Sequence, residues 1–116
     1  MYIQNELDDK DVILRCDDGS GGVTPYLTLD GSATSIKVAK NLELADNVRL
    51  RAGSSDDLQL YHDTSNSYIQ NSTGHLYIQS NEADKDLVLQ CDDGSGGTTA
   101  YLTLDGSATN VDVAQH

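Results

Sequence analysis

Acidic side chains in glycine-rich loops are the first candidates for chemistry in this chain. Sixteen of the 19 acidic residues are Asp, and two Asp-Asp-Gly-Ser-Gly-Gly loops occupy 17–22 and 92–97. Calcium takes about six to eight oxygen ligands, and its loops combine spaced acids with a turn glycine. The acids here are adjacent rather than alternating. The pattern therefore favours ordinary turns, in which Asp and Gly are common, and a calcium site is the alternative interpretation.

Two cysteines form the second candidate pair. Cys16 and Cys91 stand at equivalent points of two similar segments, 75 residues apart. An intrachain disulfide requires Cα atoms within about 7 Å, whereas 75 residues place these positions several strands apart. We expect each cysteine to be a buried free thiol that packs as a small apolar side chain. An intrachain disulfide and an interchain contact near a trimer axis are the alternatives.

Histidines and paired carboxylates do not form a recognisable catalytic or metal motif. His62, His75 and His116 lack the spacing of the short histidine motifs that bind zinc. Three copies of one histidine on a threefold axis are the alternative arrangement. The Asp residues lie in solvated turns, whereas a glycosidase needs two carboxylates around a sugar-sized cleft. The sequence therefore predicts no catalytic residue, no metal site and no cofactor, and a protein that is not an enzyme.

Six tyrosines lie in or beside the expected strands, and two pairs of them are equivalent by repeat, Tyr2/Tyr77 and Tyr26/Tyr101. Tyr packs well on pleated surfaces, so we expect core or rim packing. A stacking platform for carbohydrate is the alternative interpretation.

The elements that must position these side chains show a period of two. Apolar residues recur at spacing two with polar residues between them, which is typical of strands with one buried face. No sustained helical stripe occurs, so no helix of significant length is expected. The pairs are Val12/Leu14, Leu27/Leu29, Ile36/Val38, Leu42/Leu44, Val48/Leu50, Leu58/Leu60, Leu76/Ile78, Leu87/Leu89, Leu102/Leu104 and Val111/Val113.

Turn signals separate these runs. Asp30-Gly31 and Asp105-Gly106 are tight-turn dipeptides, and further turns are expected at 52–57, 62–66 and 71–74. Leu29 and Leu104 directly precede the two Asp-Gly turns, and we predict that both side chains face inward.

The chain repeats itself. Residues 2–40 and 77–115 align without a gap, and 26 of the 39 aligned positions are identical. Stacked architectures need such repeats because each unit buries its apolar face against the next. We therefore predict an all-β, elongated fibre shaft of β-helix or β-solenoid type. Its parts are repeat copy one at 1–40, an intervening β module at 41–76 and repeat copy two at 77–116.

Composition limits both the core and the partners. The chain of 116 residues has no Phe and no Trp, and its formal net charge is −12. The negative charge argues against nucleic acid and anionic membranes as partners, and no apolar run approaches a spanning length of about 18 residues. The small aliphatic side chains favour narrow layers, and we expect the monomer to depend on association for stability.

Several strings resemble repeats in tail-fibre and tail-associated structural proteins of marine bacteriophages. They lie at 45–51, 56–63, 66–69 and 74–78, and the Asp-Lys-Asp blocks at 9–31 and 84–106 are similar to the same repeats. The resemblance implies an extracellular virion fibre, often a homotrimer with intertwined or side-by-side chains. It implies a shaft, with any contact to a host surface receptor made through another region.

The expected function is therefore a stiff rod that presents a distal receptor-binding element. The alternative is a self-assembling extracellular filament or adhesin subunit, built as a single-chain β-solenoid. A calcium-dependent or glycan-binding module is a third class. Strands expected at Tyr2–Gln4 and Val111–Val113 would leave edges open at the two ends, so we expect axial contacts between neighbouring copies there.

Overall fold

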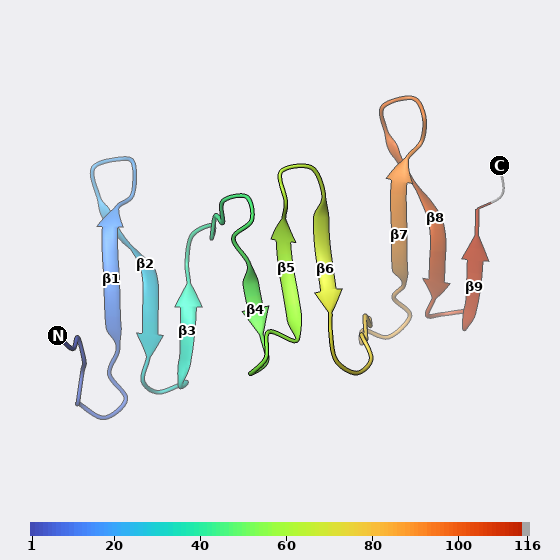
Figure 1. The fold of residues 1–116 in the computed structure, drawn as a ribbon. Coiled ribbons are helices and arrows are strands. Elements are labelled where there is room, and N and C mark those ends of the chain that lie inside the picture. The colour runs from blue at the N-terminus through green and yellow to red at the C-terminus, as the bar shows by residue number, and fades with distance from the viewer. Residues whose placement is uncertain (115–116) are drawn as a thin grey trace. The chain divides into compact units, whose positions relative to one another are not determined.

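The computed structural model describes residues 1–114 and is all-β in that part, with 43% of residues in strands and no helix. Nine strands form three antiparallel sheets, and each sheet contains three strands that follow one another in the chain (Figure 1). The strands are β1 (Val12–Asp17), β2 (Val23–Asp30), β3 (Ser35–Val38), β4 (Leu50–Ala52), β5 (Leu58–His62), β6 (Ser67–Asn71), β7 (Leu87–Asp92), β8 (Thr98–Asp105) and β9 (Asn110–Val113).

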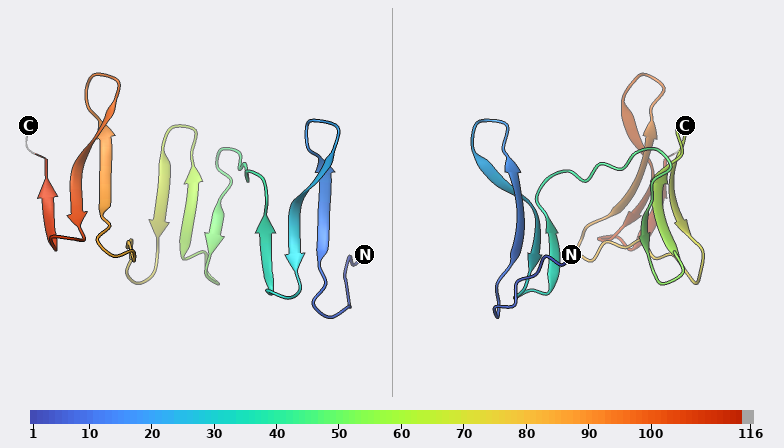
Figure 2. Two further views of the ribbon diagram at one scale, coloured as in Figure 1. Left: turned by 180° about the vertical axis from the view of Figure 1, so that it is seen from behind. Right: turned by 60° about the vertical axis from the view of Figure 1, so that its left-hand side comes forward.

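Each of the segments 1–40, 41–76 and 77–116 contains one of these sheets. By its internal contacts the chain divides into two compact units, one over Met1–Gln70 and one that begins at Asn71. Within every sheet the strands lie side by side in chain order, as the two views of Figure 2 show.

The first sheet gathers aliphatic side chains on one face, as the period of two predicts. Residues directly opposite one another on paired antiparallel strands share a face. The strand pairing therefore places two apolar rows on one face of the sheet. The rows are Val12–Leu29–Ile36 and Leu14–Leu27–Val38.

The third sheet repeats this arrangement residue for residue. Its rows are Leu87–Leu104–Val111 and Leu89–Leu102–Val113. The same register in both sheets follows from the shared turns and hydrophobic pattern, which together fix strand pairing.

Each long hairpin contains a β-bulge at a tyrosine. Leu14 pairs with Leu27 but Arg15 pairs with Pro25, so Tyr26 is the extra residue on β2. The Tyr26 hydroxyl donates to the Asp17 carbonyl at 3.0 Å. Tyr101 occupies the same place in the third sheet and donates to the Asp92 carbonyl at 3.0 Å. The bulge thus turns a tyrosine back onto the end of the hairpin, where its hydroxyl ties the strand end in place.

Three expected strand segments are not strands. Leu42/Leu44 and Leu76/Ile78 lie between sheets, and Tyr2–Gln4 also lacks strand structure. A strand needs a neighbour that accepts and donates its backbone hydrogen bonds, and within residues 1–114 no sheet includes these segments. The predictions of strands at these positions are wrong for this reason.

Burial differs from the expectation as well. Among the described residues no hydrophobic side chain is buried, and Asp30 is the one buried residue. Leu29 and Leu104 are 42% and 43% exposed, so the prediction that they face inward is wrong within the described chain. A single layer covers a side chain from below only, and burial requires a second layer on the open side.

No helix in the described residues has the length and apolar character needed to cross a membrane.

Candidate functional site

The apolar faces of the two repeated sheets are the most distinctive surfaces of the molecule. The first apolar face consists of Val12, Leu14, Leu27, Leu29, Ile36 and Val38, and the second consists of Leu87, Leu89, Leu102, Leu104, Val111 and Val113. The most exposed of these side chains lie on the third strand of each sheet, Ile36 at 69% and Val113 at 65%. Contiguous exposed apolar side chains mark contact surfaces.

A groove lies at one end of each apolar face, beside the Asp-Gly turn. In the first repeat it encloses about 380 Å³ and is lined by Ile3, Gln4, Lys10, Leu29 and Asp30, among others. The second repeat has an equivalent groove of about 260 Å³, lined by the residues 75 positions further on, including Ile78, Gln79, Lys85, Leu104 and Asp105. A third, apolar hollow of about 110 Å³ lies between Ile3 and the first apolar face. The segment before β1 therefore lies against that face without covering it.

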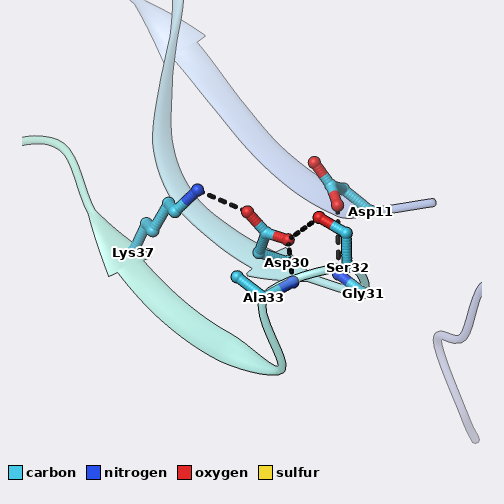
Figure 3. A network of polar contacts seen from close by, with 6 residues as sticks. All are labelled: Asp11, Asp30, Gly31, Ser32, Ala33 and Lys37. Atoms are coloured by element: carbon cyan, nitrogen blue, oxygen red, sulfur yellow. Dashed lines mark hydrogen bonds and ion pairs between the residues drawn. The ribbon is translucent and has the colours of Figure 1, made fainter. Parts of the chain in front are cut away.

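The turn between β2 and β3 is built around the carboxylate of Asp30 (Figure 3). Its Oδ1 accepts hydrogen bonds from the Ser32 hydroxyl at 2.9 Å and the Ala33 amide at 2.8 Å, and its Oδ2 pairs with the Lys37 ammonium. The Lys37 ammonium, followed by the Ala33 amide and the Ser32 hydroxyl, holds the pKa of Asp30 well below its usual range. In return, Asp30 raises the pKa of Lys37. The turn is therefore stabilised by an ionised carboxylate.

Gly31 is required at the next position by a close backbone approach. Its amide donates to Asp11 Oδ1 at 3.1 Å. A Cβ at Gly31 would lie 2.4 Å from the Lys10 carbonyl oxygen. A Cβ at Gly106 would lie at the same distance from the Lys85 carbonyl oxygen. The Asp-Gly dipeptide thus holds the segment before β1 against the β2–β3 turn.

The second repeat keeps this turn but changes its charge. Asp105 Oδ1 accepts hydrogen bonds from the Ala108 amide at 2.7 Å and the Ser107 hydroxyl at 2.8 Å, which lower the pKa of Asp105, the amide contributing most. Asp112 stands where the first repeat has Lys37, so the Asp30–Lys37 ion pair has no counterpart.

The Asp-Asp-Gly-Ser-Gly-Gly loops close on their own second aspartate. Asp18 Oδ1 accepts hydrogen bonds from the Ser20 amide and hydroxyl, both at 2.8 Å, and from the Gly22 amide at 3.0 Å. These donors, the Ser20 hydroxyl first, lower the pKa of Asp18, and Asp93 makes the same contacts with a lowered pKa. Local donors therefore satisfy Oδ1 of each of these aspartates. Within residues 1–114 no three His, Cys, Asp or Glu side chains are grouped to hold a metal ion.

Both cysteines are free and exposed. The prediction that each is a buried thiol is wrong within the described chain, because no second layer covers the sheet. Cys16 follows Leu14 at spacing two and lies opposite Thr24, which places it at the end of the first apolar face. Cys91 takes the same place on the second face, opposite Thr99.

His62 and His75 contact different residues. The His62 ring lies 3.1 Å from the Ser67 hydroxyl through Nδ1, and His75 meets the edge of Tyr77 with ring centroids 6.2 Å apart. His116 lies outside the described residues.

The middle sheet has an aromatic ladder that sequence reasoning missed. The Arg49 guanidinium lies 4.2 Å from the centre of the Tyr61 ring, and the Tyr61 and Tyr68 rings stack at 4.8 Å. Tyr68 also donates to Asp63 Oδ2 at 2.8 Å, and this bond raises the pKa of Tyr68. Through cation–π and stacking interactions these contacts join Tyr61 on β5 and Tyr68 on β6 to Arg49, which directly precedes β4. The spacing of these residues along the chain does not indicate the ladder. Only the pairing of the strands in the middle sheet brings them together.

Comparison with known proteins gives no further assignment. The chain matches no family model, no curated protein and no solved structure.

Proposed function

We propose that this chain is a structural shaft segment of a phage-type tail fibre, assembled as a homotrimer of side-by-side or intertwined chains in an extracellular virion. The observation that carries the proposal is the lack of any buried hydrophobic residue among residues 1–114. A protein whose apolar side chains all keep contact with solvent needs partners to gain a core. A shaft made of several chains supplies such partners along its whole length.

The size of the hydrophobic effect supports this argument. Full burial of an aliphatic side chain contributes about 1.5–3 kcal/mol, and a side chain that is half exposed forgoes roughly half of that. Ordering the backbone costs about 1–2 kcal/mol per residue. Sheets with open faces therefore gain stability from covering those faces.

The repeat and the composition support a structural role. The same sheet occurs twice with identical register, which suits the repeated layers of a β-solenoid-type shaft. The resemblance of the 9–31 and 84–106 blocks to phage fibre repeats points the same way. The carboxylates described above stabilise turns, and none is paired in a cleft as acid–base catalysis would need.

A self-assembling extracellular filament or adhesin subunit is the second candidate, and the open sheet edges favour it. The described residues form three sheets that share no strand, so each sheet has two edge strands. Edge strands present unpaired backbone groups that can pair with another chain. End-to-end growth through β1, β3, β7 or β9 would then produce a filament.

Mass in solution separates these functions. The chain has a mass of 12.5 kDa, and a shaft segment should sediment as a discrete particle of three chain masses. A filament subunit should form particles whose length increases with protein concentration, visible by electron microscopy. A folded monomer at every concentration would contradict both proposals.

A further inference from the structure

The two copies of the repeat differ in sequence more on one face of the sheet than on the other. The apolar side carries Val12, Leu14, Cys16, Thr24, Leu27, Leu29, Ile36 and Val38, and the opposite side carries Ile13, Arg15, Asp17, Val23, Pro25, Thr28, Asp30, Ser35 and Lys37. Two of the eight apolar-side positions differ in the second copy, both by one aliphatic residue for another. Six of the nine opposite-side positions differ, and one of them reverses a charge.

We propose that the first and second apolar faces are the surfaces through which copies of this chain pack against one another, with the opposite faces turned to solvent. The inference rests on the proposed function and specifies the contact that it requires. A surface in contact with a partner restricts its residues, whereas a solvated surface tolerates exchange such as Lys37 for Asp112. The pattern of difference between the two copies follows that division.

The chemistry of the faces identifies the kind of partner. Neither apolar face has a charged side chain, although the chain has a formal net charge of −12. A strongly charged partner would gain nothing from these faces. A flat, uncharged, aliphatic surface fits them, and sheet faces of this kind pack about 10 Å apart.

Another copy of the chain presents such a surface in the required form. The two faces are the same in register and nearly the same in sequence, so a partner must offer two similar surfaces. A second copy has both, and symmetric assemblies use self-complementary or repeated surfaces of this kind. The spacing between neighbouring strands and the rise per residue along a strand make each face about 14 Å wide and about 20 Å long, or roughly 300 Å².

This area shows that the faces must act together. A stable interface buries about 800 Å² per partner, so one sheet face alone is too small. Both repeated faces, with the aliphatic side of the middle sheet formed by Leu50, Ala52, Leu58 and Leu60, approach that size. Loss of either repeated face should therefore weaken the whole assembly.

The test compares two double variants of the full chain. The substituted positions of the second variant directly follow those of the first. Leu27→Asp with Leu102→Lys places a charge on each apolar face. Thr28→Asp with Thr103→Lys places the same charges on the opposite faces, where the residues directly across, Lys37 and Asp112, have the opposite sign. We expect the leucine variant to raise the dissociation constant by roughly a hundredfold or more, because an uncompensated charge is costly to bury. The threonine variant should assemble as the unchanged protein does. Sedimentation equilibrium measures both.

A second measurement needs no disruptive variant. Cys16 and Cys91 lie at the ends of the two faces and are exposed in the single chain. In the assembly their reaction with an aromatic disulfide reagent should be slow compared with a thiol introduced by Ser65→Cys in the exposed β5–β6 turn. Denaturant should make all three thiols react at similar rates.

The outcomes separate the inference from the proposed function. Two outcomes would contradict the proposed packing faces but not the proposed shaft. In the first, the leucine variant still assembles; in the second, the two native thiols of the assembly react as fast as the introduced one. A monomer contradicts both proposals, and slow thiols in that monomer would show that the faces cover each other within one chain. An assembly that only the leucine variant disrupts, with slow native thiols, supports the inference.

Discussion

Replacement of Gly31 by Ala gives the most direct test of the turn geometry. The added Cβ would lie 2.4 Å from the Lys10 carbonyl oxygen and 3.2 Å from its carbonyl carbon, both backbone atoms. An ordinary contact needs roughly 1 Å more, so the segment before β1 or the β2–β3 turn must shift. Overpacking of this kind costs about 1–3 kcal/mol.

The shift also affects a hydrogen bond. The Gly31 amide donates to Asp11 Oδ1 at 3.1 Å, and a bond to a charged acceptor contributes about 1.5–3 kcal/mol. If half or more of this bond is lost, the total destabilisation is about 2–5 kcal/mol. Gly106→Ala should cost the same, since the Lys85 carbonyl oxygen lies at the same distance.

Urea unfolding followed by far-ultraviolet circular dichroism measures the effect, at one fixed protein concentration because stability depends on association. Gly19→Ala is the matched control. Its Cβ meets nothing within 4 Å, and only the positive φ of 83° opposes it, at a cost of about 1–2 kcal/mol. If Gly31→Ala were no more destabilising than Gly19→Ala, the close approach to Lys10 would not constrain the turn.

Three further predictions concern side chains. Leu29→Ala and Leu104→Ala should each lower the stability of the assembled protein by about 2–5 kcal/mol; melting at unchanged temperature in both variants would mean that nothing covers these faces. Asp30 has a lowered pKa and Lys37 a raised one, so the contribution of Asp30 should be lost as the pH falls below about 4 and that of Lys37 as it rises above about 10.4. Asp30→Asn should flatten the acid side of a plot of melting temperature against pH; an unchanged acid limb would argue against this carboxylate. Millimolar calcium should leave the melting temperature unchanged because Asp18 already accepts three loop donors, and a rise of several degrees would restore the calcium interpretation.

Local pattern predicted which side chains share a face. The pairs Leu27/Leu29 and Ile36/Val38 lie on one side of their sheet, as the period of two requires. The Asp30-Gly31 turn also lies where the sequence places it, because Asp and Gly favour turns through local hydrogen bonds and small size. These features depend on neighbours in the sequence and can therefore be read from it.

Features that depend on distant parts of the chain could not be predicted. Leu42/Leu44 has the same period but no strand beside it, and the period carries no information about pairing. Tyr26 forms a bulge that only the register reveals. The burial expected for Cys16 presupposed a second layer, and composition does not show whether that layer belongs to the same chain.

The distribution of charge on the edge strands bears on the choice between face packing and edge pairing. Charged side chains on an edge strand oppose pairing with another edge. The outer strands of the repeated sheets carry them: Arg15 and Asp17 on β1, Lys37 on β3, Asp92 on β7 and Asp112 on β9.

The first and second apolar faces have no such charge. Association through the edges is therefore opposed by charged residues on the outer strands, while association through the faces meets no opposing charge. This difference favours chains packed face to face in a shaft over chains joined edge to edge in a filament.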